Sequence, residues 1–253
     1  MGSSRLPERG IGAHRGGAAT HPENTLAAFR HAVALGAHQI EFDVRQTADG
    51  EIVVIHDKTV DRTADAPGKV SRRKLAQLRK LDFGRWKSDR FTGERIATLA
   101  ETLDALPRDV WINLQIKKGE PVADEVARLV AERARLDQVF VTCGNAAAQT
   151  ARAVAPKILI CNLVRQASRA AYVDHAIAAR SDFVQFHYMR GAPEPELVER
   201  AKRAGLRVNY FCDPNGCELP PLFEAGVDFA LVDDVAAALR EVRALGIEPV
   251  ARD

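Results

Sequence analysis

Two histidines and two carboxylates near the amino terminus have the types and spacing that catalysis requires. His14 precedes Arg15, and His56 follows a short apolar run. Between them, Glu41 and Asp43 stand two residues apart, so in a strand both would point to one face. Carboxylates at that density suit a hard divalent cation, and a nearby histidine suits proton transfer. The segment therefore predicts metal-assisted acid–base chemistry.

A hairpin is expected to bring these residues together. Asp49 and Gly50 separate two apolar runs, and Asp-Gly favours a two-residue loop because Gly tolerates a positive φ. A loop of that length would place Asp43 directly opposite His56 on the returning strand.

The same motifs resemble the glycerophosphodiester phosphodiesterase family, a branch of the phospholipase C-like barrel superfamily. The resemblance is dense in the amino-terminal half and rests mainly on strand–helix rhythm in the other half. The matching segments are His14-Arg15-Gly16, Pro22-Glu23-Asn24-Thr25, Glu41-x-Asp43, His56-Asp57, Asp61-Arg62-Thr63, Ile96-Ala97-Thr98-Leu99-Ala100-Glu101, Gln115-Ile116-Lys117 and Gly226-Val227-Asp228.

The resemblance implies hydrolysis of a small phosphodiester, most simply a glycerophosphodiester that yields glycerol phosphate and an alcohol. It makes His14 and His56 the acid–base pair, with the order of base and acid left open. It makes Glu41 and Asp43 ligands of a divalent ion, either Mg²⁺ or Ca²⁺ with Mn²⁺ as a further candidate. Arg15, together with a lysine discussed next, would hold the phosphate.

Lys117 ends an alternating run in which Asn113, Gln115 and Lys117 point to one face. By resemblance Lys117 holds phosphate, and Gln115 stands where the family usually has a glutamate as third metal ligand. Three other interpretations remain open. Lys117 could form a Schiff base, the carboxylates could form structural salt bridges with Arg15 or Lys117, or a weakened metal site could mark a non-catalytic phosphate-binding relative. A lysophospholipase D or cyclic-phosphate-forming activity is a variant of the main interpretation.

The rest of the chain alternates strand and helix patterns, which predicts an α/β fold, a (β/α)8 TIM barrel in a single domain of residues 1–253. Glu51–Ile55 is excluded as a barrel strand because a hairpin makes it antiparallel to its neighbour. The expected strands are Gly10–His14, Gln39–Val44, Val110–Lys117, Gln138–Thr142, Lys157–Cys161, Asp182–Phe186, Arg207–Phe211 and Asp228–Val232. The expected helices are Asn24–Leu35, Asp124–Arg135, Ala146–Val154, Ala167–Ala179, Glu194–Ala204, Leu219–Glu224 and Val235–Leu245.

A small insertion after the second strand, at about residues 57–109, is expected over the barrel mouth, with a helix at Ser71–Leu81 capped by Ser71. Asn24 and Thr25 are expected to begin or cap the first helix. Residues near the ends of later strands are candidates for the alcohol pocket: His187, Phe211 and Asn162.

The chain has 253 residues, 36 basic and 34 acidic, for a net charge of +2. This balance predicts a small-molecule substrate and no nucleic-acid partner. Cys143, Cys161, Cys212 and Cys217 form no C-x-x-C pair, and we expect reduced cysteines, although a Cys212–Cys217 disulfide is sterically open. No apolar run could span a bilayer, and the first ten residues contain no secretory signal, which together predict a cytoplasmic protein.

Overall fold

A computed structural model describes residues 6–164 and 166–252. The first five of the ten residues searched for a secretory signal therefore lie outside the described residues. Within the described residues, eight parallel strands close into a barrel, which confirms the predicted fold. Their order is β1, β2, β4, β5, β6, β7, β8, β9, and β9 pairs with β1 again. The strands are β1 Gly10–Ala13, β2 Gln39–Gln46, β4 Trp111–Ile116, β5 Val139–Cys143, β6 Leu159–Asn162, β7 Phe183–His187, β8 Arg207–Phe211 and β9 Phe229–Val232.

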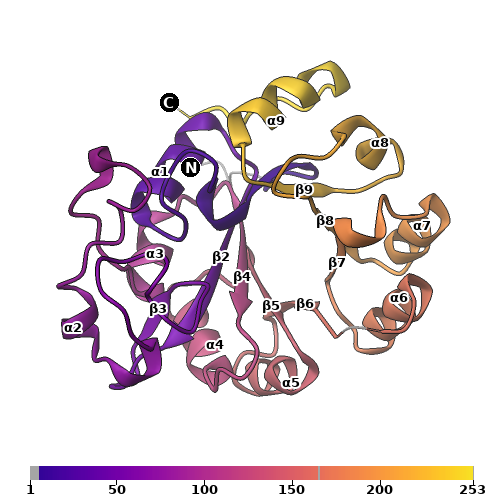
Figure 1. Ribbon diagram of the computed structural model, residues 1–253. Helices are drawn as coiled ribbons and strands as arrows, with labels where there is room; N and C mark the ends of the chain where they lie inside the picture. Colours follow the sequence, from indigo (N-terminus) through magenta and orange to yellow (C-terminus); the bar gives the residue numbers. More distant parts are fainter. Residues whose placement is uncertain (1–5, 165, 253) are drawn as a thin grey trace.

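Helices cover the outside of this barrel (Figure 1). Their inward faces and the outward faces of the strands form the main apolar core. The α-helices are α1 Leu26–Leu35, α2 Leu75–Leu78, α3 Leu99–Ala105, α4 Ala123–Glu132, α5 Asn145–Val154, α6 Arg169–Ala178, α7 Pro195–Arg203, α8 Leu219–Glu224 and α9 Val235–Val242. The short 3-10 turns are η1 His14–Gly16, η2 Val70–Arg72, η3 Asp89–Phe91, η4 Tyr188–Arg190 and η5 Arg243–Leu245.

The inside of the barrel changes character from one end to the other. Near the amino ends of the strands lies an aromatic plug, in which the rings of Phe140 and Phe183 stack with centroids 3.8 Å apart. Above it, buried amides hydrogen-bond across the barrel, as Asn113 does to Gln185 at 3.2 Å. The carboxyl ends carry the charged residues. The plug excludes water from below, so the polar chemistry is confined to one face.

The hairpin has a different register from the predicted one. Strand β3, Ile52–Val54, is antiparallel to β2, but Val44 pairs with Val54. Thr47 and Glu51 flank the turn, joined by a backbone hydrogen bond of 2.9 Å, and Gly50 has φ +87°. The loop therefore holds three residues with glycine in the left-handed position. Asp43 accordingly bonds to the N–H of Ile55 and does not face His56 across the ladder.

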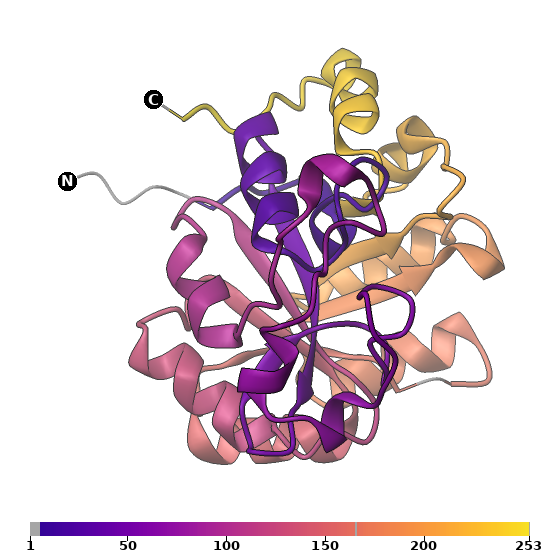
Figure 2. The ribbon, with the colours of Figure 1, turned by 60° about the vertical axis from the view of Figure 1, so that its left-hand side comes forward.

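The insertion after β3 has an apolar cluster of its own, containing Val53, Leu78 and Phe83. Figure 2 shows it as an outer layer on one side of the barrel. The predicted helix at Ser71–Leu81 is wrong: Ser71 lies inside η2, and only the short α2 follows. The short α2 contributes one fully buried side chain to the cluster, that of Leu78. The second barrel helix is retained as α3, whose cap Thr98 forms a capping box with Glu101.

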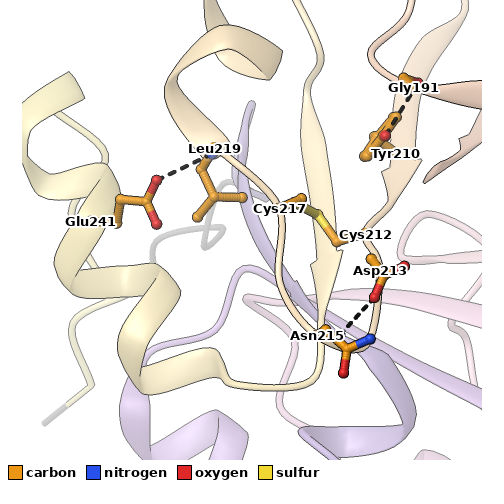
Figure 3. Close-up of a disulfide and its surroundings, with 8 residues drawn as sticks. All are labelled: Gly191, Tyr210, Cys212, Asp213, Asn215, Cys217, Leu219 and Glu241. Carbon is orange, nitrogen blue, oxygen red and sulfur yellow. Dashed lines mark hydrogen bonds between the residues drawn. A yellow bond between two sulfur atoms is a disulfide. The ribbon is translucent and has the colours of Figure 1, made fainter.

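The expectation of four reduced cysteines is also wrong. Cys212 and Cys217 form a disulfide in the loop between β8 and α8, whereas Cys143 and Cys161 are free and buried. The intervening turn brings the two cysteines together, because Asp213 accepts the N–H of Asn215 at 2.8 Å (Figure 3). Because this disulfide is present, the cysteines give no support to the predicted cytoplasmic location. Among the described residues, none of the helices is long and apolar enough to cross a membrane.

Replacing Gly50 tests the three-residue loop. No other atom lies within 4 Å of a Cβ built on Gly50, so Gly50→Ala introduces backbone strain without a clash. We expect it to destabilise the fold by about 1 kcal/mol, because the left-handed region is unfavourable for alanine. Gly50→Asn is the matched control and should lose less, since asparagine tolerates this conformation. Denaturant unfolding measures both, and an unchanged midpoint for Gly50→Ala would contradict the positive φ.

Candidate active site

His14 is the first residue after β1, and a carboxylate fixes its orientation. Its Nδ1 donates to Asp233 Oδ1 at 2.7 Å, and its Nε2 lies 4.0 Å from Glu41 Oε2. Burial lowers the pKa of His14, but the Asp233 hydrogen bond and the charge of Glu41 outweigh it and raise that pKa above its ordinary value. The ring therefore presents Nε2 to the barrel mouth.

His56 lies just beyond β3 in an equivalent arrangement. Its Nδ1 donates to Asp57 Oδ1 at 2.7 Å. Burial lowers the pKa of His56, and the charges of Arg15 and Lys117 add to the effect, so it exceeds the opposing influence of nearby carboxylates. Each histidine thus has a carboxylate on Nδ1, which orients the ring and leaves Nε2 for proton exchange.

Glu41 and Asp43 are carboxylates on β2 that are almost wholly buried, with 3% and 1% of their surface exposed. Glu41 Oε2 accepts the backbone N–H of Arg15 at 2.9 Å. Burial and the adjacent charge of Asp43 raise the pKa of Glu41 well above its ordinary value. Two buried negative charges this close are unfavourable without positive compensation.

That compensation is concentrated on Asp43. Lys117 Nζ donates to Asp43 Oδ1 at 3.1 Å, and Arg15 Nε lies 3.5 Å from Oδ2. These cations outweigh burial and lower the pKa of Asp43. Asn24 donates to Oδ2 at 3.0 Å and accepts the Asp43 N–H at 3.1 Å. Asn24 therefore does not begin the helix: its φ is +59°, and Thr25 caps α1 by accepting the N–H of Ala28.

A chain of ion pairs links the loops that carry the two histidines. Arg62 donates to Asp57 at 2.7 Å and, from both terminal nitrogens, to Glu23 at 2.7 Å each. Glu23 in turn accepts from Arg15 at 2.8 Å. Burial raises the pKa of Glu23, but Arg62 and Arg15 outweigh it and the pKa is lowered. The network connects the His56 loop to the Arg15 side chain through hydrogen bonds between charged side chains.

Gln115 lies directly opposite Asp43 in the pairing of β4 with β2. Its Oε1 accepts from Lys117 Nζ at 3.4 Å. Within residues 6–164 and 166–252, no group of three or more His, Cys, Asp or Glu side chains is arranged to hold a metal. The candidate set Glu41, Asp43 and Gln115 contains only two such residues. All three nonetheless offer oxygen, and the raised pKa of Glu41 indicates a carboxylate that a bound cation would stabilise.

The predicted pocket residues separate into two places. The Phe211 ring lies 4.5 Å from His14, and His187 packs edge-on against Phe211 at 5.1 Å, so Phe211 lies between the two histidines in this chain of ring contacts. Asn162 is buried at the end of β6, where its side chain bonds to Asn145 and to a backbone N–H. The described contacts of Asn162 are therefore structural.

Comparison with known proteins identifies the family to which this arrangement belongs. The family model of the glycerophosphoryl diester phosphodiesterase family matches residues 14–237. The chain belongs to this family. It is 33% identical over 242 residues to the glycerophosphodiester phosphodiesterase of Caldanaerobacter subterraneus, covering 91% of this chain and 96% of the relative. As a member, it is a phosphoric diester hydrolase.

Solved structures of glycerophosphodiester phosphodiesterases share the barrel. The enzyme from Agrobacterium tumefaciens superimposes with a TM-score of 0.78 at 27% identity, over 90% of this chain and 97% of that one. An Oleispira antarctica phosphodiesterase, solved in complex with its product sn-glycerol-3-phosphate, superimposes with a TM-score of 0.80 at 26% identity, over 92% and 96%.

Several charged residues of the phosphodiesterase site were not assigned a role from the sequence. Glu23 and Arg62 stand in motifs that resemble the family, but nothing local indicates that they form a network with Arg15. The uncharged Asn24 was expected at the start of the first helix, and nothing local indicates its bonds to Asp43. Asp233 follows the last barrel strand, and that position alone was a usable signal, because side chains just beyond a strand's carboxyl end face the mouth.

Asp233→Asn tests the orientation of His14. Loss of the carboxylate charge should lower kcat on a glycerophosphodiester by on the order of 10²-fold, within the range attributed to acid–base groups. Asp234→Asn is the matched control: Asp234 caps α9 by accepting from Ala237, and asparagine caps equally well. Its kcat should remain near wild type. Equal kcat values for the two variants would show that Asp233 has no bearing on catalysis.

Proposed function

We propose that this phosphodiesterase hydrolyses a small glycerophosphodiester to glycerol phosphate and an alcohol, through two histidines and a divalent cation. The observation that carries the proposal is the pair of imidazoles at one barrel mouth, each with an aspartate on Nδ1. One Nε2 takes a proton from the nucleophile, and the other gives a proton to the leaving alkoxide, which is otherwise a poor leaving group. The product bound to the Oleispira antarctica relative supports glycerol phosphate as the released product.

Arg15 and Lys117 are proposed to bind the phosphate. Both contact Asp43, so their charges are already positioned at the mouth. The guanidinium offers two parallel donors to phosphate oxygens, and the ammonium adds a point charge. Glu23 holds one end of Arg15, which leaves that side chain little freedom and reduces the entropy lost on binding.

Glu41, Asp43 and Gln115 are proposed to hold the cation. When bound, a divalent ion supplies Lewis-acid stabilisation of the negative charge that develops on the phosphate oxygens. Lys117 contacts both Asp43 and Gln115, which supports a role beside the proposed cation ligands. We place the insertion of residues 57–109 over the same mouth. The nucleophile is water or, in a route that forms a cyclic phosphate, a neighbouring hydroxyl of the substrate.

Alanine at either histidine should remove one proton transfer. His14→Ala and His56→Ala are each expected to lower kcat by about 10²- to 10⁴-fold, and the double variant should cost less than the product of the two. His175→Ala, on α6, is the control. In a nitrophenyl phosphodiester the leaving nitrophenolate needs little protonation. This substrate should therefore restore kcat only in the variant that lacks the acid. Near-normal kcat in either single variant would assign that histidine to structure.

Chelation tests the cation. EDTA should abolish turnover, and Mg²⁺, Ca²⁺ or Mn²⁺ should restore it better than Zn²⁺, because every proposed ligand is oxygen. Gln115→Glu adds a charge at the third ligand and should reach half-maximal activity at a lower metal concentration than wild type. Full activity after exhaustive chelation would rule out the cation. Equal metal requirements of wild type and Gln115→Glu would show that Gln115 is not a ligand of the cation.

A further inference from the structure

The residues from Lys69 to Arg95, here called the basic segment, concentrate positive charge. They include ten lysines and arginines but three acidic residues, Asp82, Asp89 and Glu94. The segment therefore carries a net charge of +7 in a chain whose total is +2, which leaves −5 for all other residues. The near-neutral total hides a strong local asymmetry, and a surface of one sign attracts an oppositely charged partner.

Most of this charge is exposed, and few of the exposed cations form salt bridges. Eight of the ten basic side chains are exposed. Arg79 pairs with Glu101, and Arg85 pairs with Asp89. The other six form no salt bridge in the part of the chain that the structure describes: Lys69, Arg72, Lys74, Lys80, Arg90 and Arg95. Lys74 and Arg95 interact electrostatically with Asp49 and Asp82, and all six remain exposed to an anionic partner.

The later part of the basic segment lies beside the active site. Lys87 Nζ donates to the carbonyl of Ala18 at 2.6 Å, and Arg90 donates to that of Thr20 at 2.8 Å. Both carbonyls belong to the loop between β1 and α1, which also carries the first histidine of the site. Figure 2 shows the insertion as a continuous outer layer on this side of the barrel. The positive charge therefore extends to the edge of the catalytic face.

An exposed tryptophan stands within this charged surface. Trp86 is 38% exposed, while its indole N–H donates to the carbonyl of Phe83 at 2.9 Å. The Lys87 ammonium lies 5.9 Å from the centre of the Trp86 ring. A tryptophan fixed among cationic side chains is typical of the water–lipid interface, where the ring enters the headgroup region and the cations meet lipid phosphates.

We propose that the basic segment docks the protein onto an anionic lipid surface, with Trp86 among the headgroups. The positive charge complements such a surface, and its place beside the mouth brings the active site to the layer. A single-stranded nucleic acid is the less favoured partner, because its bases require successive aromatic platforms, whereas Trp86 is the one aromatic side chain of the segment that is exposed in the described structure. The docking does not depend on the proposed reaction, so binding and turnover are measured separately.

Vesicles of phosphatidylcholine, with and without phosphatidylglycerol, test the proposal. The full-length protein should sediment only with the anionic vesicles and should be released by salt. Trp86 and Trp111 are the two tryptophans, and Trp111 is buried, so Trp111→Phe leaves Trp86 as the only source of tryptophan fluorescence. Its emission should shift to the blue on anionic vesicles. Absence of binding, or binding without this shift, contradicts the proposed contact.

Two charge-reversal variants separate local from total charge. The first replaces three exposed residues of the basic segment by glutamate: Lys69, Arg72 and Lys80. The second makes the same change at three exposed residues elsewhere: Lys157, Arg180 and Arg240. We expect the first to weaken vesicle binding at least about tenfold and the second to retain it, because lipid attraction is short-ranged.

Both variants should unfold at the wild-type temperature and hydrolyse a soluble diester at the wild-type rate, since none of the six residues lies in the site. Equal losses in vesicle binding would show that only total charge matters and would overturn the proposal. Tight binding of a single-stranded RNA oligonucleotide without vesicle binding would overturn it in favour of a nucleic-acid surface.

Discussion

Burial of two carboxylates on one strand is the constraint on which the rest of the site depends. Glu41 and Asp43 are almost wholly buried in a barrel whose lower half is filled with aromatic and amide side chains, so water solvates them poorly. Buried charges of one sign require opposite charge nearby. Arg15 and Lys117 meet this need from the first and third parallel strands along the chain. Positive groups at the mouth are therefore a structural requirement, in addition to their proposed role in binding phosphate.

Barrel closure completes the site. Ala13 on β1 pairs with Val232 on β9, so the residues that follow these partners, His14 and Asp233, come together although 219 positions separate them. His56 obtains its carboxylate from the next residue, Asp57, and keeps it in place through Arg62. The two histidines thus have the same local geometry, but the carboxylate of His14 comes from a distant segment and that of His56 from the next residue.

The sequence predicted the barrel because alternation of strand and helix is a periodic signal, and the observed strands lie within a few residues of the expected ones. It missed details governed by single residues. Ala48 joins Asp49 and Gly50 in the loop and shifts the hairpin register by one residue, and Asn24 leaves the helix to bond with Asp43. The Cys212–Cys217 bridge depends on a turn at Asp213 that no periodicity reveals.

By itself, the sequence determined which side chains share a face and which reactive types are available. The spacing of Glu41 and Asp43 places both on one side of a strand in any fold, because strand alternation is a property of the backbone alone. Only the tertiary structure decided that Asp233 orients His14, that Glu23 joins Arg15 to Arg62, and that burial raises the pKa of Glu41. These depend on contacts between distant segments and on exclusion of water, and both arise only when the strands close into a barrel.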